Sequence, residues 1–468
     1  MRTPPRAYLP DLLYAGGAVH AGAALSVVDG RVAAVGEPEV GCGWVRLAGT
    51  AILPGLVSAH SHAFQRAIRG RTEHRAAGEL AAGKRPDFWA WRDAMYEVAL
   101  RLEPDDLFAV ARMAFHEMAR AGVTAVGEFH YLHRDPAGRP YADRDEMVKQ
   151  VARAAREVGL RLTLLRVAYA RAGHGLPENP LQRRFLDRSV DEVVRSLEDL
   201  ESGLRDEWVS LGAAPHSVRA CPAGWIERLA AESRRRSLPL HVHVSEQPAE
   251  VAQCRAEHGR SPVEVLDRAG ALSPATTAVH AIHLSDGDVA LLGARGVTVC
   301  ACPTTERDLG DGIVPADRLL AAGVRLALGT DSNLQIDVLE EARALEGHLR
   351  LMRLERAVLD PGIGGIDRLG RRLWDVASTG GMASLGLRGG GLAPGDPADF
   401  LVASLDDPSL AGASAEDLLP AAVFGMARTA VRDVYVGGEP ALLSGAPARV
   451  PAEVVVQDFR DTMRKLWG

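Results

Sequence analysis

Histidine residues with the spacing of metal ligands stand at the end of an apolar run near the start of the chain. The segment is His60-Ser61-His62. Because side chains alternate along a β-strand, the imidazoles of His60 and His62 would point to the same side and could bind one ion. The chain has 15 histidines among 468 residues, so one such pair is weak evidence by itself.

Other candidate ligands end later apolar runs in the same way. One run closes with His241-Val242-His243, the next ends at His280, and the last closes with Gly329-Thr330-Asp331. Zinc binds histidine nitrogen and carboxylate oxygen, and a catalytic zinc site keeps one position open for water or substrate. Recurrence of these residue types at strand ends therefore predicts a catalytic metal site.

These residues converge only if the runs are neighbouring parallel strands. Each run is followed by an amphipathic stretch of helical length, for example the one that Pro104-Asp105-Asp106 opens. There are eight such runs: 52–60, 123–129, 161–168, 209–215, 238–244, 277–282, 297–302 and 324–329. The pattern predicts an α/β fold, a (β/α)8 TIM barrel over residues 51–386, with catalytic groups at the carboxyl ends of its strands.

Both ends of the chain have a different texture, with short β-type segments separated by turns. Residues 24–28 and 31–35 flank the turn Asp29-Gly30, and similar segments return at 398–402 and 431–436. We expect antiparallel strands from residues 1–50 and 387–449 to form one small β-sandwich domain. Residues 450–468 are expected to form a C-terminal helix.

Composition excludes several classes of protein. No apolar stretch approaches the ~20 residues that cross a bilayer, and the first residues lack the apolar core of a secretory signal. The net charge is −7 with both signs mixed along the chain, which argues against nucleic acid as a partner. The five cysteines include no Cys-x-x-Cys pair, as is typical of a reducing compartment. We expect a cytoplasmic protein without membrane partners.

The order of these ligands resembles the amidohydrolase superfamily, in which a His-x-His pair follows strand one, single histidines follow strands five and six, and an aspartate follows strand eight. The resemblance covers nearly the whole chain. It implies that His60, His62, His243 and Asp331 hold one divalent metal, expected to be Zn²⁺, with His280 beside the bound water. His243 is preferred to His241, which we expect to be a core residue, because of the superfamily's His-x-x-Glu arrangement.

A single metal is the expectation because two-metal members usually bridge their ions with a carboxylated lysine after strand four. That position lies near Pro215-His216, and the only lysines, Lys84, Lys149 and Lys465, are remote from it in sequence. A lone metal lowers the pKa of its bound water toward ~7 and so supplies hydroxide.

Glu246, three residues after His243, indicates the reaction. A carboxylic acid close to the metal can hand a proton to a leaving nitrogen, which favours deamination or deimination over peptide-type hydrolysis. Asp331 and His280 would take the proton of the attacking water, and His280 could also stabilise the tetrahedral centre. The predicted catalytic residues are therefore Glu246, His280 and Asp331.

Residues after other strands point to the substrate. Two arginines, Arg92 and Arg219, and Tyr131 suit carboxylates, because a guanidinium binds a carboxylate through two parallel hydrogen bonds. Five segments resemble, as a set, the formimidoylglutamate deiminases of this superfamily. They are His60-Ser61-His62-Ala63-Phe64-Gln65-Arg66, Phe88-Trp89-Ala90-Trp91-Arg92-Asp93, Glu128-Phe129-His130-Tyr131, His243-Val244-Ser245-Glu246-Gln247 and Leu309-Gly310-Asp311-Gly312.

This closer resemblance implies hydrolysis of N-formimino-L-glutamate, a small anionic substrate, to N-formyl-L-glutamate and ammonia in histidine degradation, by a homodimer. It assigns substrate contacts to Gln65, Arg92, Tyr131, His216, Arg219, Glu246 and His280. One departure is Asn333, where some relatives have histidine, which places a contact near the metal in question.

Two other functions remain open. A mononuclear deaminase of a purine or pyrimidine ring, similar to guanine deaminase, would need an aromatic sandwich for a flat base in place of paired arginines. A non-catalytic scaffold of the same fold would be expected to lack metal ligands, and this chain keeps all of them.

Overall fold

The computed structural model describes residues 6–37, 43–73, 88–176 and 179–468. Cys42 and Lys84 lie outside the described residues, as do the side chains of residues 88–90 and of Asp93. In the described part of the chain, no helix combines the length and the apolar character needed to cross a membrane.

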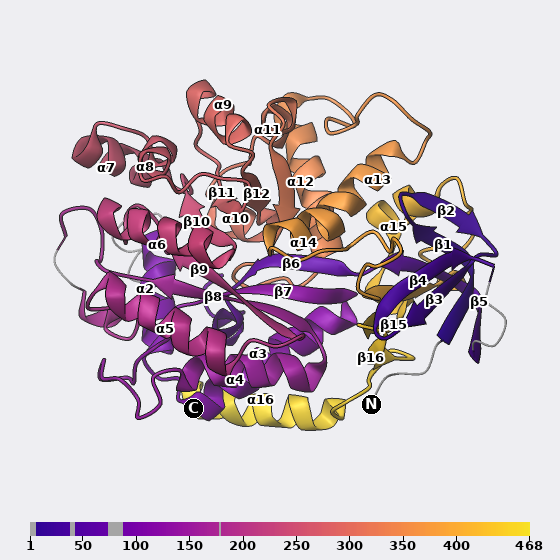
Figure 1. Cartoon of the computed structure of the whole chain (residues 1–468), viewed down its shortest axis with the longest axis horizontal. Helices are drawn as coiled ribbons and strands as arrows, with labels where there is room; N and C mark the ends of the chain where they lie inside the picture. Colours follow the sequence, from indigo (N-terminus) through magenta and orange to yellow (C-terminus); the bar gives the residue numbers. More distant parts are fainter. Residues whose placement is uncertain (1–5, 38–42, 74–87, 177–178) are drawn as a thin grey trace.

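Eight parallel strands form the barrel that the apolar runs predict (Figure 1). In sheet order they are β6 (Leu56–Ser61), β7 (Val123–His130), β8 (Arg161–Ala168), β9 (Val209–Pro215), β10 (Leu240–Val244), β11 (Thr276–His280), β12 (Thr298–Ala301) and β13 (Arg325–Leu328). A parallel bridge between Ser61 and Asp331 joins the last strand to the first. The barrel therefore closes at three of the predicted metal ligands, because His60 and His62 flank Ser61 and Asp331 is itself in the bridge.

Helices cover the outside of the barrel, as expected for strands joined by crossover connections. They are α3 (Pro104–Arg120), α4 (Glu146–Val158), α5 (Val190–Gly203), α6 (Ala223–Arg236), α7 (Pro248–His258), α8 (Pro262–Arg268), α9 (Asp286–Ala294), α10 (Pro303–Leu309), α11 (Ala316–Ala321), α12 (Val338–Arg353), α13 (Arg368–Asp375) and α14 (Gly381–Ser384). A π-helical turn, η3 (Val376–Gly380), links the last two.

Among the described residues between β6 and α3, two additional elements are found: the 3-10 helix η1 (Ala63–Ile68) and α2 (Phe88–Ala99). A second short 3-10 helix, η2 (Pro180–Gln182), follows β8 and contacts α2. α2 carries residues that line the pocket described below, and Gln182 on η2 donates hydrogen bonds to two of the tyrosines that line it.

The two chain ends fold together, as predicted, into a nine-stranded sheet, here called the chain-end sheet. Its strands are β1 (Arg6–Ala15), β2 (Ala18–Ala21), β3 (Ala24–Val28), β4 (Arg31–Gly36), β5 (Gly43–Pro54), β14 (Phe400–Ser404), β15 (Val431–Val436), β16 (Glu439–Leu443) and β17 (Ala446–Pro447). They enclose a separate core that includes Tyr8, Ile52, Phe400 and Tyr435. Between β15 and β14 lie α15 (Leu418–Gly425) and η4 (Arg428–Ala430).

Two details of the strand predictions are wrong. The β1–β5 pair is parallel, although an antiparallel sheet was expected. The predicted run 52–60 is divided at Gly55, so that its first residues belong to β5 and the rest to β6. A Cβ at Gly55 would lie 2.2 Å from Oγ1 of Thr124 on β7, so the close approach of the chain at residue 55 to β7 requires glycine.

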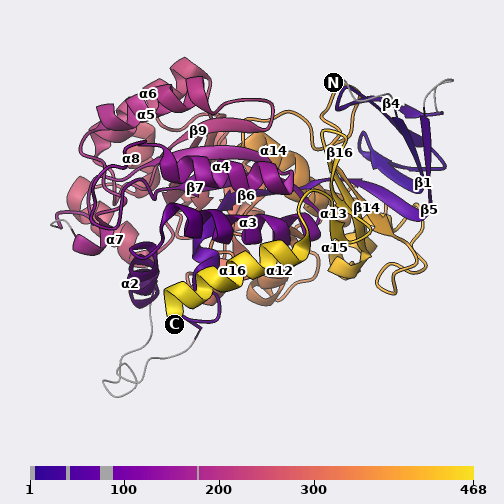
Figure 2. The same ribbon diagram turned by 90° about the horizontal axis from the view of Figure 1, so that it is seen from below.

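The chain ends in α16 (Ala452–Trp467), which lies along α3 on the outside of the barrel (Figure 2). Lys465 Nζ lies 2.6 Å from Oδ2 of Asp106 near the start of α3. Trp467 donates from Nε1 to the carbonyl of Ala67, at 3.2 Å. The C-terminal helix is thus attached to η1, the element that directly follows the His60–His62 pair.

Candidate active site

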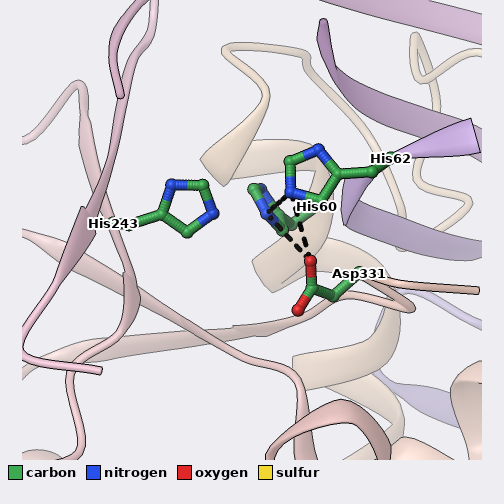
Figure 3. Close-up of side chains that lie close together, drawn as sticks. All are labelled: His60, His62, His243 and Asp331. Atoms are coloured by element: carbon green, nitrogen blue, oxygen red, sulfur yellow. Dashed lines mark hydrogen bonds and ion pairs between the residues drawn. The ribbon is translucent and has the colours of Figure 1, made fainter. Parts of the chain in front are cut away.

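The four predicted ligands meet at the carboxyl ends of β6, β10 and β13 (Figure 3). The Nε2 atoms of His60 and His62 lie 3.2 Å apart, and Oδ1 of Asp331 lies 3.4 Å from the first and 3.2 Å from the second. One ligand atom from each of these residues and from His243 lies within 4.8 Å of the other three. All four residues are buried, so they form one compact, protected cluster.

Backbone carbonyls orient two of the imidazoles. Nδ1 of His62 lies 2.9 Å from the carbonyl oxygen of Phe129, and Nδ1 of His243 lies 3.0 Å from that of His216. A carbonyl oxygen only accepts hydrogen bonds, so each of these rings carries its proton on Nδ1. The Nε2 atom of each ring is left with a lone pair, as a metal ligand requires.

The protonation states of the cluster fit a divalent metal. Burial lowers the pKa of His60 to about 3 and holds the pKa of His243 well below its usual value. Burial favours the neutral acid at Asp331, but the adjacent imidazoles of His60 and His62 outweigh it and keep that pKa well below its ordinary value. Neutral imidazoles and an ionised carboxylate are the forms that bind metal. Three nitrogens and one oxygen match a mononuclear zinc-type site.

The backbone is strained where the site residues leave their strands. Ser245, His280 and Asp331 all have positive φ angles, of 52°, 69° and 43°. A residue with a side chain held in this region costs ~1–3 kcal/mol, and such strain clusters at functional sites. Three strained positions at the carboxyl ends of β10, β11 and β13 indicate that the side-chain positions here are under functional constraint.

His280 lies between two carboxylates on the cluster side. Its Nε2 is 3.7 Å from Oε1 of Glu246 and 3.8 Å from Oδ2 of Asp331. On the other side, its Nδ1 lies 3.2 Å from Oε1 of Glu306, which also accepts a hydrogen bond from the backbone N–H of Cys302. Burial disfavours the imidazolium, yet Glu246, Glu306 and Asp331 together hold the pKa of His280 well above its usual value.

Glu246 is buried near this histidine and has the protonation behaviour of a proton donor. Burial raises the pKa of Glu246, against the attraction of His280 and Arg219. The backbone N–H of Glu246 donates to Oε2 of Glu250, at 3.0 Å. This hydrogen bond fixes the backbone at Glu246, just before α7 begins. A carboxyl group with a raised pKa close to the cluster is protonated more readily than an ordinary glutamate and can release that proton to a leaving group.

One pocket brings the cluster together with the residues predicted to contact substrate. It is lined by His62, Gln65, Trp91, Arg92, Met95, Tyr96, Tyr131, Tyr169, His216, Arg219, His243, Glu246, His280, Leu309 and Asp331. Every predicted site residue except the deeper His60 is in this set. Gln65 donates from Nε2 to the hydroxyl of Tyr131, at 3.0 Å, which fixes these two side chains relative to one another.

The structure also shows the surroundings of His241 and Asn333, two residues close to the cluster in sequence. Nε2 of His241 lies 2.9 Å from the carbonyl oxygen of Ser384 inside the barrel, so His241 points away from the cluster as expected. Asn333 donates from Nδ2 to Oγ of Ser61, at 3.1 Å, and accepts from the hydroxyl of Thr330. Asn333 therefore braces the barrel closure between β6 and β13.

Sequence reasoning missed four residues at this site. Met95, Tyr96 and Tyr169 line the pocket, and Glu306 supports His280. Tyr169 directly follows β8, much as the ligands follow their strands, whereas Met95, Tyr96 and Glu306 lie on helices. The only signal for Tyr96 and Met95 was their position one helical turn after Arg92, on the face of α2 that carries it.

The lysines and a second cavity do not alter this assignment. Lys149 pairs with Asp143, and Lys465 lies on α16, so neither of the two described lysines is near the cluster. A larger cavity of about 970 Å³ adjoins Val324 and Leu326, at the start of β13. That end of a barrel contributes to stability and not to catalysis, so chemistry and not size identifies the site.

The sequence matches the profile of the Amidohydrolase family over residues 51–441. The chain belongs to this family, whose members are hydrolases, and its relatives place it among enzymes that act on carbon–nitrogen bonds. Formimidoylglutamate deiminase of Pseudomonas aeruginosa is 39% identical over 425 residues, which are 90% of this chain and 90% of that protein. A 5-methylthioadenosine/S-adenosylhomocysteine deaminase of Natronomonas pharaonis is 30% identical, over 88% of this chain and 85% of that protein.

Solved structures agree with this family membership. An amidohydrolase from Brucella melitensis superposes with a TM-score of 0.87 at 31% identity, covering 99% of this chain and 100% of that one. An adenosine deaminase from Xanthomonas campestris with bound zinc gives a TM-score of 0.80 at 23% identity, over 98% of each chain. The second likeness supports the fold alone.

Proposed function

We propose that this enzyme hydrolyses N-formimino-L-glutamate to N-formyl-L-glutamate and ammonia, with one zinc ion held by His60, His62, His243 and Asp331. The observation that carries the proposal is the content of one pocket, in which Arg92 and Arg219 lie with Glu246 and three residues of the four-residue cluster. The 39% identity to a formimidoylglutamate deiminase supports the same substrate.

The metal supplies a nucleophile when it is bound, because a divalent ion lowers the pKa of a coordinated water enough to give hydroxide at neutral pH. The residues around it then handle protons. Glu246, with its raised pKa, donates a proton to the departing nitrogen, so that ammonia leaves and not an amide anion.

His280 and Asp331 complete the proton path. Because His280 lies within 4 Å of both Glu246 and Asp331, it can hold a proton between them and stabilise negative charge at the reacting carbon. Glu306 acts through His280: its carboxylate fixes the orientation of the ring by accepting from Nδ1. Glu306 is therefore a positioning residue.

The rest of the pocket would hold the glutamate portion of the substrate. Guanidinium groups of Arg92 and Arg219 suit its two carboxylates. Arg219 is buried among Tyr169, Tyr96, Glu246 and Glu250, which raise its pKa despite the opposing effect of burial, so it remains charged in the pocket. Gln65, Tyr131 and His216 border the same space and are proposed to position the formimino end.

A ring deaminase is the second candidate, because relatives at 30% identity act on 5-methylthioadenosine or S-adenosylhomocysteine. Four aromatic residues line the pocket, namely Trp91, Tyr96, Tyr131 and Tyr169. Arg92 and Arg219 favour a dianion over a neutral base, since a guanidinium matches the geometry of a carboxylate and a base carries no carboxylate.

The test is ammonia release from the metal-loaded enzyme with N-formimino-L-glutamate, 5-methylthioadenosine, adenosine, guanine and cytosine in parallel. Formation of N-formyl-L-glutamate, followed by NMR of the formyl proton, is the expected result. Release of ammonia from a ring substrate only would overturn the deiminase proposal and leave the family assignment intact.

We also propose a place for the enzyme in the cell: a cytoplasmic homodimer that acts in histidine degradation. The identity to the Pseudomonas enzyme supports the pathway. The five cysteines, which include no Cys-x-x-Cys pair, support a reducing compartment. Sedimentation equilibrium tests the dimer, because a monomer of 49.9 kDa would contradict it.

A further inference from the structure

Two tyrosine hydroxyls meet in the pocket without a role in the reaction proposed above. Tyr96 comes from α2 and Tyr169 directly follows β8, and both line the pocket. Their Oη atoms lie 3.3 Å apart. The amide of Gln182, on η2, donates from Nε2 to both, at 2.8 Å to Tyr96 and 2.9 Å to Tyr169. The three polar groups form a closed hydrogen-bonded triangle that is buried.

Counting hydrogens in this triangle shows that one is left over. The two N–H hydrogens of Gln182 are both used, one on each hydroxyl. Each tyrosine carries one O–H hydrogen, and the contact between the hydroxyls uses only one of the two. Among the described residues, neither hydroxyl has a further hydrogen-bond acceptor. One phenolic hydrogen is therefore available to a molecule in the pocket.

The opposite orientation of the Gln182 amide is less favourable. With oxygen and nitrogen exchanged, both hydroxyls would donate to the amide oxygen, and no hydrogen would lie between oxygens 3.3 Å apart. Two buried N–H groups would also lose their acceptors. In the orientation found here only Oε1 of Gln182 lacks a partner, and an unsatisfied acceptor is the commoner exception in proteins.

The charged groups beside the triangle cannot accept the remaining hydrogen. The guanidinium of Arg92 lies over the ring of Tyr96, 5.4 Å from its centroid, and Arg219 interacts electrostatically with Tyr169 and Tyr96. A guanidinium has donors and no acceptor. The leftover phenolic hydrogen and the two guanidinium groups are therefore all hydrogen-bond donors toward a ligand at this corner of the pocket, and two of these groups are cationic.

We infer that Tyr96 and Tyr169 form a shared donor that selects a carboxylate over a carboxamide at this corner of the substrate pocket. The inference rests on the proposed function and names the residues that set its specificity. A carboxylate can accept from every group here, whereas a carboxamide would turn an N–H group toward another donor and leave it unsatisfied.

The sharing of one hydrogen makes a distinctive prediction for single and double variants. If Tyr96→Phe removes one hydroxyl, the hydrogen of Tyr169 no longer has Tyr96 as an acceptor and can go to the ligand. In Tyr169→Phe, the hydrogen of Tyr96 likewise loses its acceptor and can go to the ligand. Each single variant should therefore bind the carboxylate about as well as the wild type, and only the double variant should lose the hydrogen bond.

The experiment is calorimetric binding of N-formyl-L-glutamate and of its two monoamides, at the α- and γ-carboxyl groups, to the metal-loaded enzyme. We expect the double variant to lose roughly 10- to 150-fold in affinity for the diacid, as for a hydrogen bond to a charged group. One monoamide should bind weakly to the wild type and show little further loss in the double variant. Tyr435→Phe, in the chain-end sheet, is the matched control for replacing a buried tyrosine.

Three results would overturn the inference. They are a double variant that binds the diacid like the wild type, an equal loss for all three ligands, which marks a purely structural role, and a full loss in either single variant. If the wild type fails to bind the diacid at all, the proposed substrate fails together with this inference. If the wild type and the double variant bind the diacid equally well, the inference is refuted and the proposed substrate stands.

Discussion

The pocket has two halves that are built in different ways. The metal half is the four-residue cluster of ligands, and the recognition half contains the residues proposed to hold the glutamate portion, among them Arg92 and Tyr96. His60, His243 and Asp331 stand at the ends of barrel strands, and backbone carbonyls or neighbouring ligands fix the rings. Arg92 and Tyr96, in contrast, come from a helix inserted between β6 and α3. A barrel can thus keep one half for hydrolytic chemistry while the inserted elements determine which molecule is hydrolysed.

This comparison predicts that substitutions in the metal half reduce turnover more than substitutions in the recognition half. Replacing His62 or Asp331 by Ala should lower metal affinity by more than the ~10- to 100-fold that loss of an outer hydrogen bond costs, and should reduce turnover to background. Metal content by elemental analysis checks the first effect. His348→Ala, on α12 and outside the pocket, is the control and should retain one equivalent.

A result of two equivalents of metal in active wild-type enzyme would contradict the mononuclear site. So would an Asp331→Ala variant with normal metal content, because that carboxylate is the only acid in the four-residue cluster.

Glu246 lies between the halves, and its replacement should separate chemistry from binding. Glu246→Gln is nearly isosteric but cannot deliver a proton, so kcat should fall by ~10²- to 10⁴-fold while the metal stays bound. Single-turnover kinetics with ammonia detection measure this loss. Turnover at the wild-type rate, with the chemical step limiting, would assign the proton donor to another group.

The two halves also differ in how far the sequence predicts them. Side-chain alternation and the order of the apolar runs predict the barrel and place His60, His62 and Asp331 correctly. Tyr96, Tyr169 and Gln182 lie far apart in sequence, and only the packing of α2 against η2 brings them together. Contacts of this kind leave no periodic signal in one sequence.

The two details of the strand predictions that are wrong have a related cause. An apolar run shows that residues are buried, but it does not show which sheet they join. The run 52–60 looks continuous, yet its first part pairs with β14 and its second part with β7, on either side of Gly55. The parallel β1–β5 pair likewise depends on how the chain crosses the sheet and not on local residues.

In the recognition half, loss of either arginine should lower activity less than loss of a metal ligand does, and the two losses should be similar. Arg92→Met or Arg219→Met removes a charge-assisted contact, so kcat/KM for N-formimino-L-glutamate should fall roughly 10- to 150-fold with metal content unchanged. Arg139→Met, whose side chain is 78% exposed, is the control and should behave like the wild type. Wild-type kinetics in both Arg92 and Arg219 variants would remove the basis for a dianionic substrate.

Metal removal should have the smallest effect on the fold. The barrel keeps its own apolar core, so a chelated enzyme should remain folded and lose only the stabilisation by ligand binding. That term is ~2.7 kcal/mol when free metal is at one hundred times its dissociation constant. Thermal denaturation with and without chelator measures it. Global unfolding on chelation would show that the metal half is structural.

The most direct measurement compares kcat/KM for N-formimino-L-glutamate with kcat/KM for 5-methylthioadenosine in one preparation of the zinc-loaded enzyme. The two arginines and the shared tyrosine donor predict that the dianion is the better substrate, by at least the ~10- to 150-fold that one charge-assisted contact contributes. Equal values, or a higher value for 5-methylthioadenosine, would contradict the proposed recognition of two carboxylates and make the enzyme a ring deaminase with the same metal site.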